Sequence, residues 1–130
     1  MSSTPRPRNI RLRKQSRILE LDFGEGELFS LSWEFLRVHS PSAEVRGHHP
    51  SQAQLQTGKK NVGINELRPV GHYALQIIFD DGHDSGLYAW DYLYTLGRDQ
   101  DRLWRDYLEQ LDKAGVSRDP DVQVLHFDPG

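Results

Sequence analysis

The stretch from Tyr73 to Gly97, YALQIIFDDGHDSGLYAWDYLYTLG, constrains the fold more than any other part of the sequence. Its β-branched and aromatic residues predict a strand over 73–79. The Asp-Asp-Gly sequence at 80–82 favours a turn, because glycine reaches positive φ without steric cost and aspartate tolerates the left-handed region. A short second strand over 84–88 leads into apolar residues at helical spacing, and Gly97 suits a helix C-cap. The stretch therefore predicts a strand–turn–strand–helix unit.

An earlier stretch, RILELDFGEGELFSLSWEFLRV at 17–38, looks like a second copy of this unit. The copies agree once a one-residue insertion is allowed: Phe23 and Gly26 match Phe79 and Gly82, Leu31 matches Leu87, and Trp33, Phe35 and Leu36 match Trp90, Tyr92 and Leu93. This pattern favours a structural repeat. The alternative is that any hairpin followed by a helix would show the same similarity.

A third periodic segment follows the repeat. Residues 99–114 predict an amphipathic helix, and Gly115 suits its C-cap. The polar connection at 39–61 is expected to be irregular, and Pro69 suits an edge strand or a bulge. One face of the helix carries Leu103, Trp104, Tyr107, Leu108 and Leu111.

These elements predict an α+β fold: a mostly antiparallel sheet built from the two units and covered by helices on one side, plus the C-terminal amphipathic helix. Six basic and no acidic residues occur in the first seventeen positions, where Pro5 and Pro7 disfavour regular structure. We therefore expect a flexible basic arm over 1–15, the folded domain over 16–115 and a C-terminal tail over 116–130.

The composition narrows the function classes. The 130 residues suit a single domain, and the absence of cysteine excludes disulfides, thiolate zinc sites and a cysteine nucleophile. No apolar run approaches the ~20 residues that span a bilayer, and the N-terminus lacks the apolar segment of a secretory signal, so we expect a cytoplasmic protein. The net charge of −3, and a basic arm without aromatic residues to stack on bases, disfavour nucleic-acid binding.

Three segments, LRVHSPSAEVRGHHP, VGINELRPVGHYALQIIFDDGH and SGLYAWDYL, carry a family resemblance. The chain resembles, over about residues 16 to 97, a stand-alone bacterial domain of unknown function that is similar to the N-terminal domain of γ-butyrobetaine hydroxylase. The resemblance implies a zinc ion held in that hydroxylase by three cysteines and one histidine. The matching positions here are Ser40, Ser42 and Val45 for the cysteines and His83 for the histidine. Hydroxyls are poor zinc ligands, so we expect this zinc site to be lost.

The same resemblance predicts a candidate binding surface. It implies that the segment 40–45 lies close to His83, and we expect hydrogen bonds between serine hydroxyls and the imidazole in place of metal coordination. Arg37 and Glu44 are expected to present charge at the same surface. The predicted surface comprises Arg37, His39, Ser40, Ser42, Glu44, His48 and His83.

We predict no catalytic residue and no cofactor. The chain has no G-x-S-x-G elbow beside Ser85, the segment around Gly58 departs from a P-loop, and His126-Phe127-Asp128 lacks the third ligand of an iron facial triad. The resemblance implies a domain that also occurs attached to oxygenases and to P-loop ATPases of iron–sulfur assembly. We therefore expect a non-catalytic binding or accessory module whose partner is another protein. The alternatives are a zinc- or iron-binding protein that uses His83 with His39 or His48 and, with less support, a small hydrolase.

Overall fold

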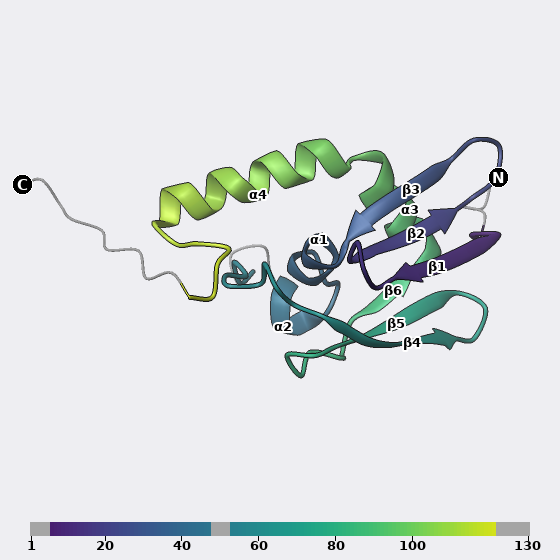
Figure 1. Cartoon of the computed structure of the whole chain (residues 1–130), viewed down its shortest axis with the longest axis horizontal. Coiled ribbons are helices and arrows are strands. Elements are labelled where there is room, and N and C mark those ends of the chain that lie inside the picture. The colour runs from purple at the N-terminus through teal and green to yellow at the C-terminus, as the bar shows by residue number, and fades with distance from the viewer. Residues whose placement is uncertain (1–5, 48–52, 122–130) are drawn as a thin grey trace, which may run out of the picture.

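The computed structural model describes residues 6–47 and 53–121 (Figure 1). It contains two three-stranded antiparallel sheets, each followed directly by a helix. The first unit comprises β1 (Asn9–Arg13), β2 (Ile18–Asp22), β3 (Leu28–Ser32) and α1 (Trp33–Val38), and the second comprises β4 (Ile64–Val70), β5 (Ala74–Phe79), β6 (Leu87–Ala89) and α3 (Trp90–Arg98). Helix α2 (Ala43–Arg46) lies between the units, and α4 (Gln100–Ala114) follows them. The predicted α+β class, the two units and the C-terminal helix are confirmed, although the strands form two sheets instead of one.

The repeat holds in three dimensions, with one correction to the predicted alignment. Trp33 and Trp90 each begin a helix directly after the last strand of their unit. Leu31 and Tyr88, both 0% exposed, therefore occupy equivalent positions, whereas Leu87 is 46% exposed. The one-residue insertion in the second unit therefore lies before Leu87, whereas the predicted alignment placed it after Leu87. The sequence similarity alone could not distinguish these two positions.

Strand β1 corrects the prediction of a flexible arm over 1–15. It pairs with β2 from Asn9 opposite Asp22 to Arg13 opposite Ile18. Ile10 and Leu12 pack against the core, while the intervening basic side chains point away from it. The high content of arginine concealed this alternating strand pattern, and residues 1–5 lie outside the described part of the chain.

The long connection between the units contains the short helix α2, which the sequence analysis did not predict. Ser42 caps α2, because its hydroxyl accepts a hydrogen bond from the Glu44 amide at 3.2 Å. β4 is an edge strand with an irregular register between Ile64 and Glu66, and Pro69 lies within it, so the expected edge position of Pro69 is confirmed. The proline removes one amide donor at a place where a neighbouring strand is lacking on one side.

Gly97 lies inside α3 and does not end that helix, contrary to the prediction. A Cβ atom at this position would lie 2.4 Å from Cγ of Phe29 on β3. The glycine therefore permits close contact between α3 and the first sheet. Gly115 ends α4 with φ +67°, in the left-handed conformation expected for a C-cap.

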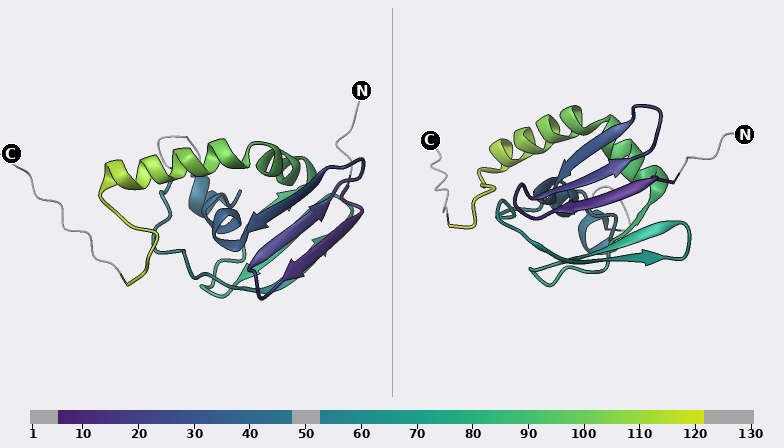
Figure 2. Two further views of the ribbon diagram at one scale, coloured as in Figure 1. Left: turned by 45° about the horizontal axis from the view of Figure 1, so that its top comes forward. Right: turned by 45° about the vertical axis from the view of Figure 1, so that its right-hand side comes forward.

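The main core lies between the two sheets and beneath α1 and α3, where leucine, isoleucine and aromatic side chains from both units are buried. Figure 2 shows the two sheets one over the other, with α1, α2 and α4 gathered toward the other end of the molecule. A second, smaller cluster joins α4 to α1 through Tyr107, Leu111 and Val38, with Leu55 beside them. Leu108, expected on the inward face of α4, is exposed. Among the described residues, no helix is long and apolar enough to cross a membrane.

Candidate functional site

Ser40, His83 and Glu44 form a chain of hydrogen-bonded side chains at the junction of the two units. Ser40 Oγ lies 2.8 Å from His83 Nε2, and His83 Nδ1 lies 3.1 Å from Glu44 Oε2. Ser40 and His83 are 1% and 6% exposed, so both are removed from solvent. The predicted proximity of the 40–45 segment to His83, and its hydrogen bonding, are confirmed.

The positions of the protons in the Ser40–His83–Glu44 hydrogen bonds follow from which groups can donate and which can only accept. The Glu44 carboxylate can only accept, so Nδ1 of His83 donates to it. In a neutral ring Nε2 then accepts from the Ser40 hydroxyl, whose oxygen also accepts from the Ser42 amide at 3.3 Å. Burial, together with the positive charge of Arg37, lowers the pKa of His83 despite the nearby Glu44 carboxylate. The imidazole is therefore neutral near pH 7, with both nitrogens engaged.

A second set of contacts locks α2 onto the strand that follows the turn. Ser42 Oγ lies 2.7 Å from Ser85 Oγ, and the Ser85 hydroxyl donates to Glu44 Oε2 at 3.2 Å. Gly86 makes this approach possible, because a Cβ atom there would lie 2.5 Å from Ser40 Oγ. The two segments that hold the predicted residues thus fit directly against each other.

The Ser40–His83–Glu44 order is also that of a hydrolase triad, but its surroundings do not suit acyl transfer. The Ser40 hydroxyl is shielded from solvent, and the Ser40 amide donates to the Arg37 carbonyl at 3.3 Å. That amide is therefore already engaged and does not point at a developing oxyanion. The geometry instead holds the 40–45 segment in place.

Arg37 does not present its charge to solvent, contrary to the prediction. It is 7% exposed, and its guanidinium donates to Asp81 at 2.9 Å and to the side chain of Gln56 at 3.0 Å. Lys59 also contacts Asp81, at 2.7 Å. Burial alone would raise the pKa of Asp81, but hydrogen bonds from Lys59, the His83 amide and Arg37 lower it. Arg37 therefore ties α1 to the turn before His83.

His39 lies apart from this cluster. Its Nδ1 is 3.1 Å from the Phe35 carbonyl, and its ring packs against Phe35 and Tyr107. Burial lowers the pKa of His39, even though the bond to Phe35 favours the protonated ring. His48 lies outside the described residues. Within the described ranges, no three histidine, aspartate or glutamate side chains form a group that could hold a metal ion.

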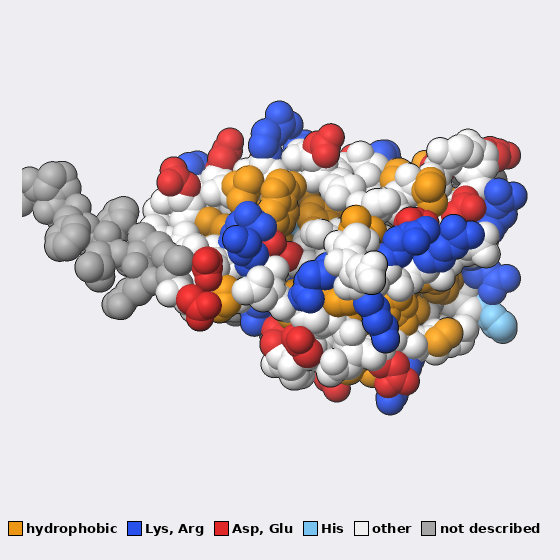
Figure 3. Space-filling view, viewed as in Figure 1, with side chains coloured by type: hydrophobic (Ala, Val, Ile, Leu, Met, Phe, Trp, Pro, Cys, Tyr) orange, Lys and Arg blue, Asp and Glu red, His pale blue; other side chains and the backbone are white. Residues whose placement is uncertain are grey.

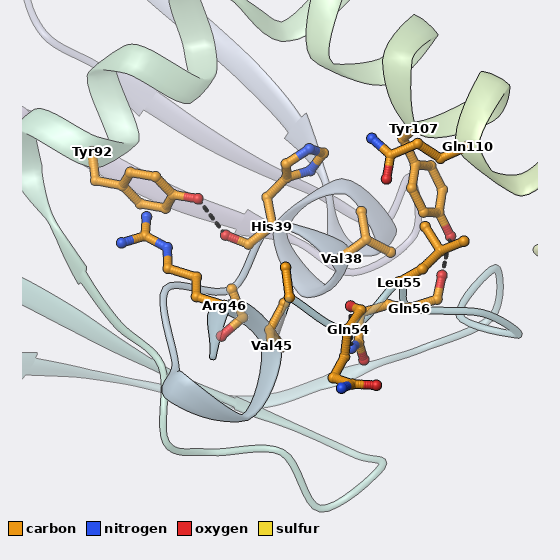
Figure 4. Close-up of a pocket in the computed structure, with 12 residues that line it drawn as sticks. Val38, His39, Val45, Arg46, Gln54, Leu55, Gln56, Tyr92, Tyr107 and Gln110 are labelled. Carbon is orange, nitrogen blue, oxygen red and sulfur yellow. Dashed lines mark hydrogen bonds between the residues drawn. The ribbon is translucent and has the colours of Figure 1, made fainter. Parts of the chain in front are cut away.

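Beside the cluster, between α1, α2 and α4, lies a cavity of about 420 Å³ (Figure 4). His39 and Ser40, both predicted site residues, line it. The other lining residues come from α1 and α2 (Val38, Val45, Arg46), the following segment (Ala53, Gln54, Leu55, Gln56), α3 (Tyr92) and α4 (Tyr107, Gln110). Sequence reasoning missed most of these residues, because they come from four separate stretches of the chain. The signal that could have found Tyr92 was the excess of aromatic residues near α3.

Two tyrosine hydroxyls brace the cavity walls. Tyr92 donates to the His39 carbonyl at 2.5 Å, and Tyr107 donates to the Gln56 carbonyl at 2.7 Å. Burial, with a smaller effect of the Glu34 carboxylate, raises the pKa of Tyr107 to about 12. The guanidinium of Arg46 lies over the Tyr92 ring, 4.5 Å from its centroid. These contacts fix the lining residues relative to one another.

Residues 10–94 match the family described as gamma-butyrobetaine hydroxylase-like, N-terminal. The chain belongs to this family. The match begins at β1, so it includes part of the segment that the sequence predicted as a loose arm, and it ends within α3. Among curated proteins, none matches this chain.

Three solved structures are similar to this one, two of them over nearly the whole chain. One NMR solution structure is 53% identical, with 96% of this chain and 98% of that chain covered and a TM-score of 0.82. A second is 48% identical, with 98% and 97% covered and a TM-score of 0.78. A crystal structure of a protein of unknown function of the DUF971 family, from Acidithiobacillus ferrooxidans ATCC 23270, is 38% identical, with 75% and 98% covered and a TM-score of 0.62.

The cavity is lined both by residues within the segment that matches the family and by residues outside it. Helix α4, which supplies Tyr107 and Gln110, lies outside the matched segment of the gamma-butyrobetaine hydroxylase-like N-terminal family. The hydrogen-bonded cluster and Tyr92 lie inside it. The family domain therefore provides one wall of the cavity and α4 provides the other.

Proposed function

We propose that this protein is a non-catalytic accessory module that binds a protein partner at the cavity between α1, α2 and α4. The observation that carries the proposal is the cavity itself, which has a volume of about 420 Å³ and is lined by both apolar and polar side chains. Clefts of this size with a few placed polar groups are typical of binding sites. The adjoining Ser40–His83–Glu44 cluster supports the site by fixing the position of α2.

Binding is favoured over catalysis because the reactive groups are engaged internally. The Ser40 hydroxyl, both nitrogens of His83 and one carboxylate oxygen of Glu44 all have partners within the cluster. The hydroxyls of Tyr92 and Tyr107 are likewise bonded to backbone carbonyls. A catalytic triad shares such bonds, but here the Ser40 hydroxyl is buried and the Ser40 amide is bonded to the Arg37 carbonyl, which favours a structural role for the cluster.

A protein partner is favoured by the residue types and by the surrounding surface. Tyrosine and arginine are enriched at interface hot spots, and Arg46 stacked on Tyr92 supplies both at the edge of the cavity. Figure 3 shows apolar side chains at the surface near α4, with positive and negative groups interspersed around them. Leu108 on α4 is 37% exposed. A mixed surface of this kind suits a polar interface with an apolar centre.

Site-specific photocrosslinking tests the proposal. A benzoylphenylalanine in place of Ala53, an exposed residue of the cavity lining, should give one discrete protein adduct when the full chain is irradiated in the native cell. A Gln110→Trp change should abolish that adduct by filling the cavity. The same photoreactive residue in place of Arg68, which is exposed on β4, is the matched control. Identical adducts from both positions, or none from position 53, would contradict the proposal.

Metal analysis discriminates this proposal from the alternative of zinc or iron binding through His83. The alternative needs His83 to release a hydrogen bond and recruit further ligands, because structural zinc sites use four ligands. Protein purified without a histidine tag should carry far less than one metal ion per chain. Stoichiometric zinc or iron that is lost in His83→Asn would replace the accessory-module proposal by the metal-binding one.

A further inference from the structure

We infer that the cavity accepts an acidic side chain of the partner next to an apolar one. This inference rests on the proposed function and names the chemistry that the cavity recognises. Its basis is the charge of the lining: the residues around the cavity include the cationic Arg46 but no aspartate or glutamate. A site with this balance favours an anionic group.

Arg46 is the arginine of the cavity lining, and it has no carboxylate partner within the described part of the chain. The buried guanidinium of Arg37 and that of Arg118 each contact a carboxylate within 2.9 Å. Some exposed arginines, such as Arg8 and Arg105, also lack an ion pair with any described residue, but they do not line the cavity. It is held instead over the face of Tyr92, which leaves its N–H donors available at the ring's edge. A guanidinium held in this way can donate two parallel hydrogen bonds to one carboxylate.

Gln110 provides a second polar contact across the cavity. Figure 4 shows its side chain on the α4 wall beside Tyr107, with His39 between it and Arg46. Its amide has no hydrogen-bond partner among the described residues, and an amide can donate to a carboxylate or accept from a backbone N–H. A single arginine with one amide matches the single charge of a carboxylate better than a phosphate dianion.

The apolar part of the lining indicates the neighbouring residue of the partner. Val38 and Val45 are buried at the base of the cavity, and Leu55 is half-buried beside them. A carboxylate alone would leave this surface wet, whereas an adjoining leucine- or valine-sized side chain would cover it. The volume of about 420 Å³ accommodates two side chains of this size.

Glu44, the nearest acidic residue in sequence to Arg46, does not neutralise the site. Its carboxylate accepts hydrogen bonds from His83 and Ser85, on the side of α2 that faces the cluster. It is absent from the residues that line the cavity. The cluster therefore also keeps a competing carboxylate away from the guanidinium.

NMR titration of the full chain with short peptides tests the inference. Three octapeptides with central Glu-Leu, Gln-Leu and phosphoserine-Leu pairs, and free 4-methylpentanoate, serve as probes. The Glu-Leu peptide should shift the amide signals of Arg46, Tyr92 and Gln110 in a saturable way, and the Gln-Leu peptide should bind at least tenfold more weakly. Arg46→Gln should weaken the Glu-Leu peptide at least fivefold, Arg46→Lys less, and Arg68→Gln not at all.

Each other result has a defined meaning. Equal binding of the Glu-Leu and Gln-Leu peptides in the cavity would overturn the carboxylate while leaving the binding module intact. Tighter binding of the phosphoserine peptide, or of free 4-methylpentanoate, would assign the site to a phosphorylated partner or to a small-molecule acid and overturn the inference. If no probe shifts these signals while the position-53 crosslink persists, the inference fails and the proposed function stands. If neither the peptide-induced shifts nor the crosslink is observed, both the inference and the proposed function are refuted.

Discussion

Gly97→Ala is expected to destabilise the protein, although the same change stabilises most helices. Alanine gains about 0.8–1 kcal/mol over glycine inside a helix. Here the new Cβ would lie 2.4, 2.5 and 2.9 Å from Cγ, Cδ2 and Cβ of Phe29. The Phe29 ring cannot rotate away from this overlap, because Cβ and Cγ sit close to the backbone of β3. Overpacking of this kind costs about 1–3 kcal/mol, so after the helix gain a net loss of up to about 2 kcal/mol follows.

Urea unfolding followed by tryptophan fluorescence measures this loss, with the slope of the transition unchanged. A double-mutant cycle identifies its cause. In a Phe29→Ala background the Cγ and ring contacts disappear, so Gly97→Ala should cost at least about 1 kcal/mol less than in the wild type. A gain in stability from Gly97→Ala alone, or an equal cost in both backgrounds, would refute the close contact between α3 and β3.

Three further changes test other parts of the structure. Tyr88→Phe should cost about 1–3 kcal/mol in urea unfolding, because it leaves a buried α1 carbonyl without its donor; a loss below 0.5 kcal/mol would contradict that bond. Burial lowers the pKa values of His39 and His83 in the folded chain, so the unfolded chain binds more protons and the free energy of unfolding should fall as the pH drops from about 7.5 to 5.5. His39→Gln should reduce that fall, and a free energy of unfolding that does not change with pH would refute the lowered pKa values. Arg118→Ala should cost about 1–3 kcal/mol by leaving the buried Glu34 unpaired, whereas Arg98→Ala, which breaks an exposed pair, should leave the unfolding free energy unchanged.

The repeat unit was predictable because its signals are local. Alternation over β2 and β5, the turn sequence after β5 and the helical spacing in α3 and α4 each lie within one short window. β1 was missed because its polar face carries arginines, so composition suggested a tail. Gly97 was misinterpreted for a different reason: the residue that requires a glycine there is Phe29, which is distant in the sequence. A close contact between two elements leaves no trace in the periodicity of either one.

In the candidate site, too, the features that depend on distant residues could not be predicted from local sequence patterns. The contact between Ser40 and His83 was predictable only through the family resemblance, since forty-three positions separate the two residues. Arg37 was expected to face solvent because it is charged, but Asp81 and Gln56 satisfy its guanidinium in the interior. The cavity could not be predicted at all, because its walls come together only when α4 folds back onto α1.

Hydrogen bonds and packing hold together the two segments that the family resemblance matched to a zinc site, namely residues 40–45 and the turn with His83. A metal fixes several segments through a few strong bonds, whereas hydrogen bonds contribute about 0.5–1.5 kcal/mol each. The chain therefore adds packing to the cluster: Val45 is buried, Ser42 caps α2, and Gly86 admits the Ser40 hydroxyl. These contacts hold α2 and the Ser40 segment before it, and α2 places Arg46 over the Tyr92 ring. His83, through its bond to Glu44, therefore helps to fix the position of a helix that lines the cavity.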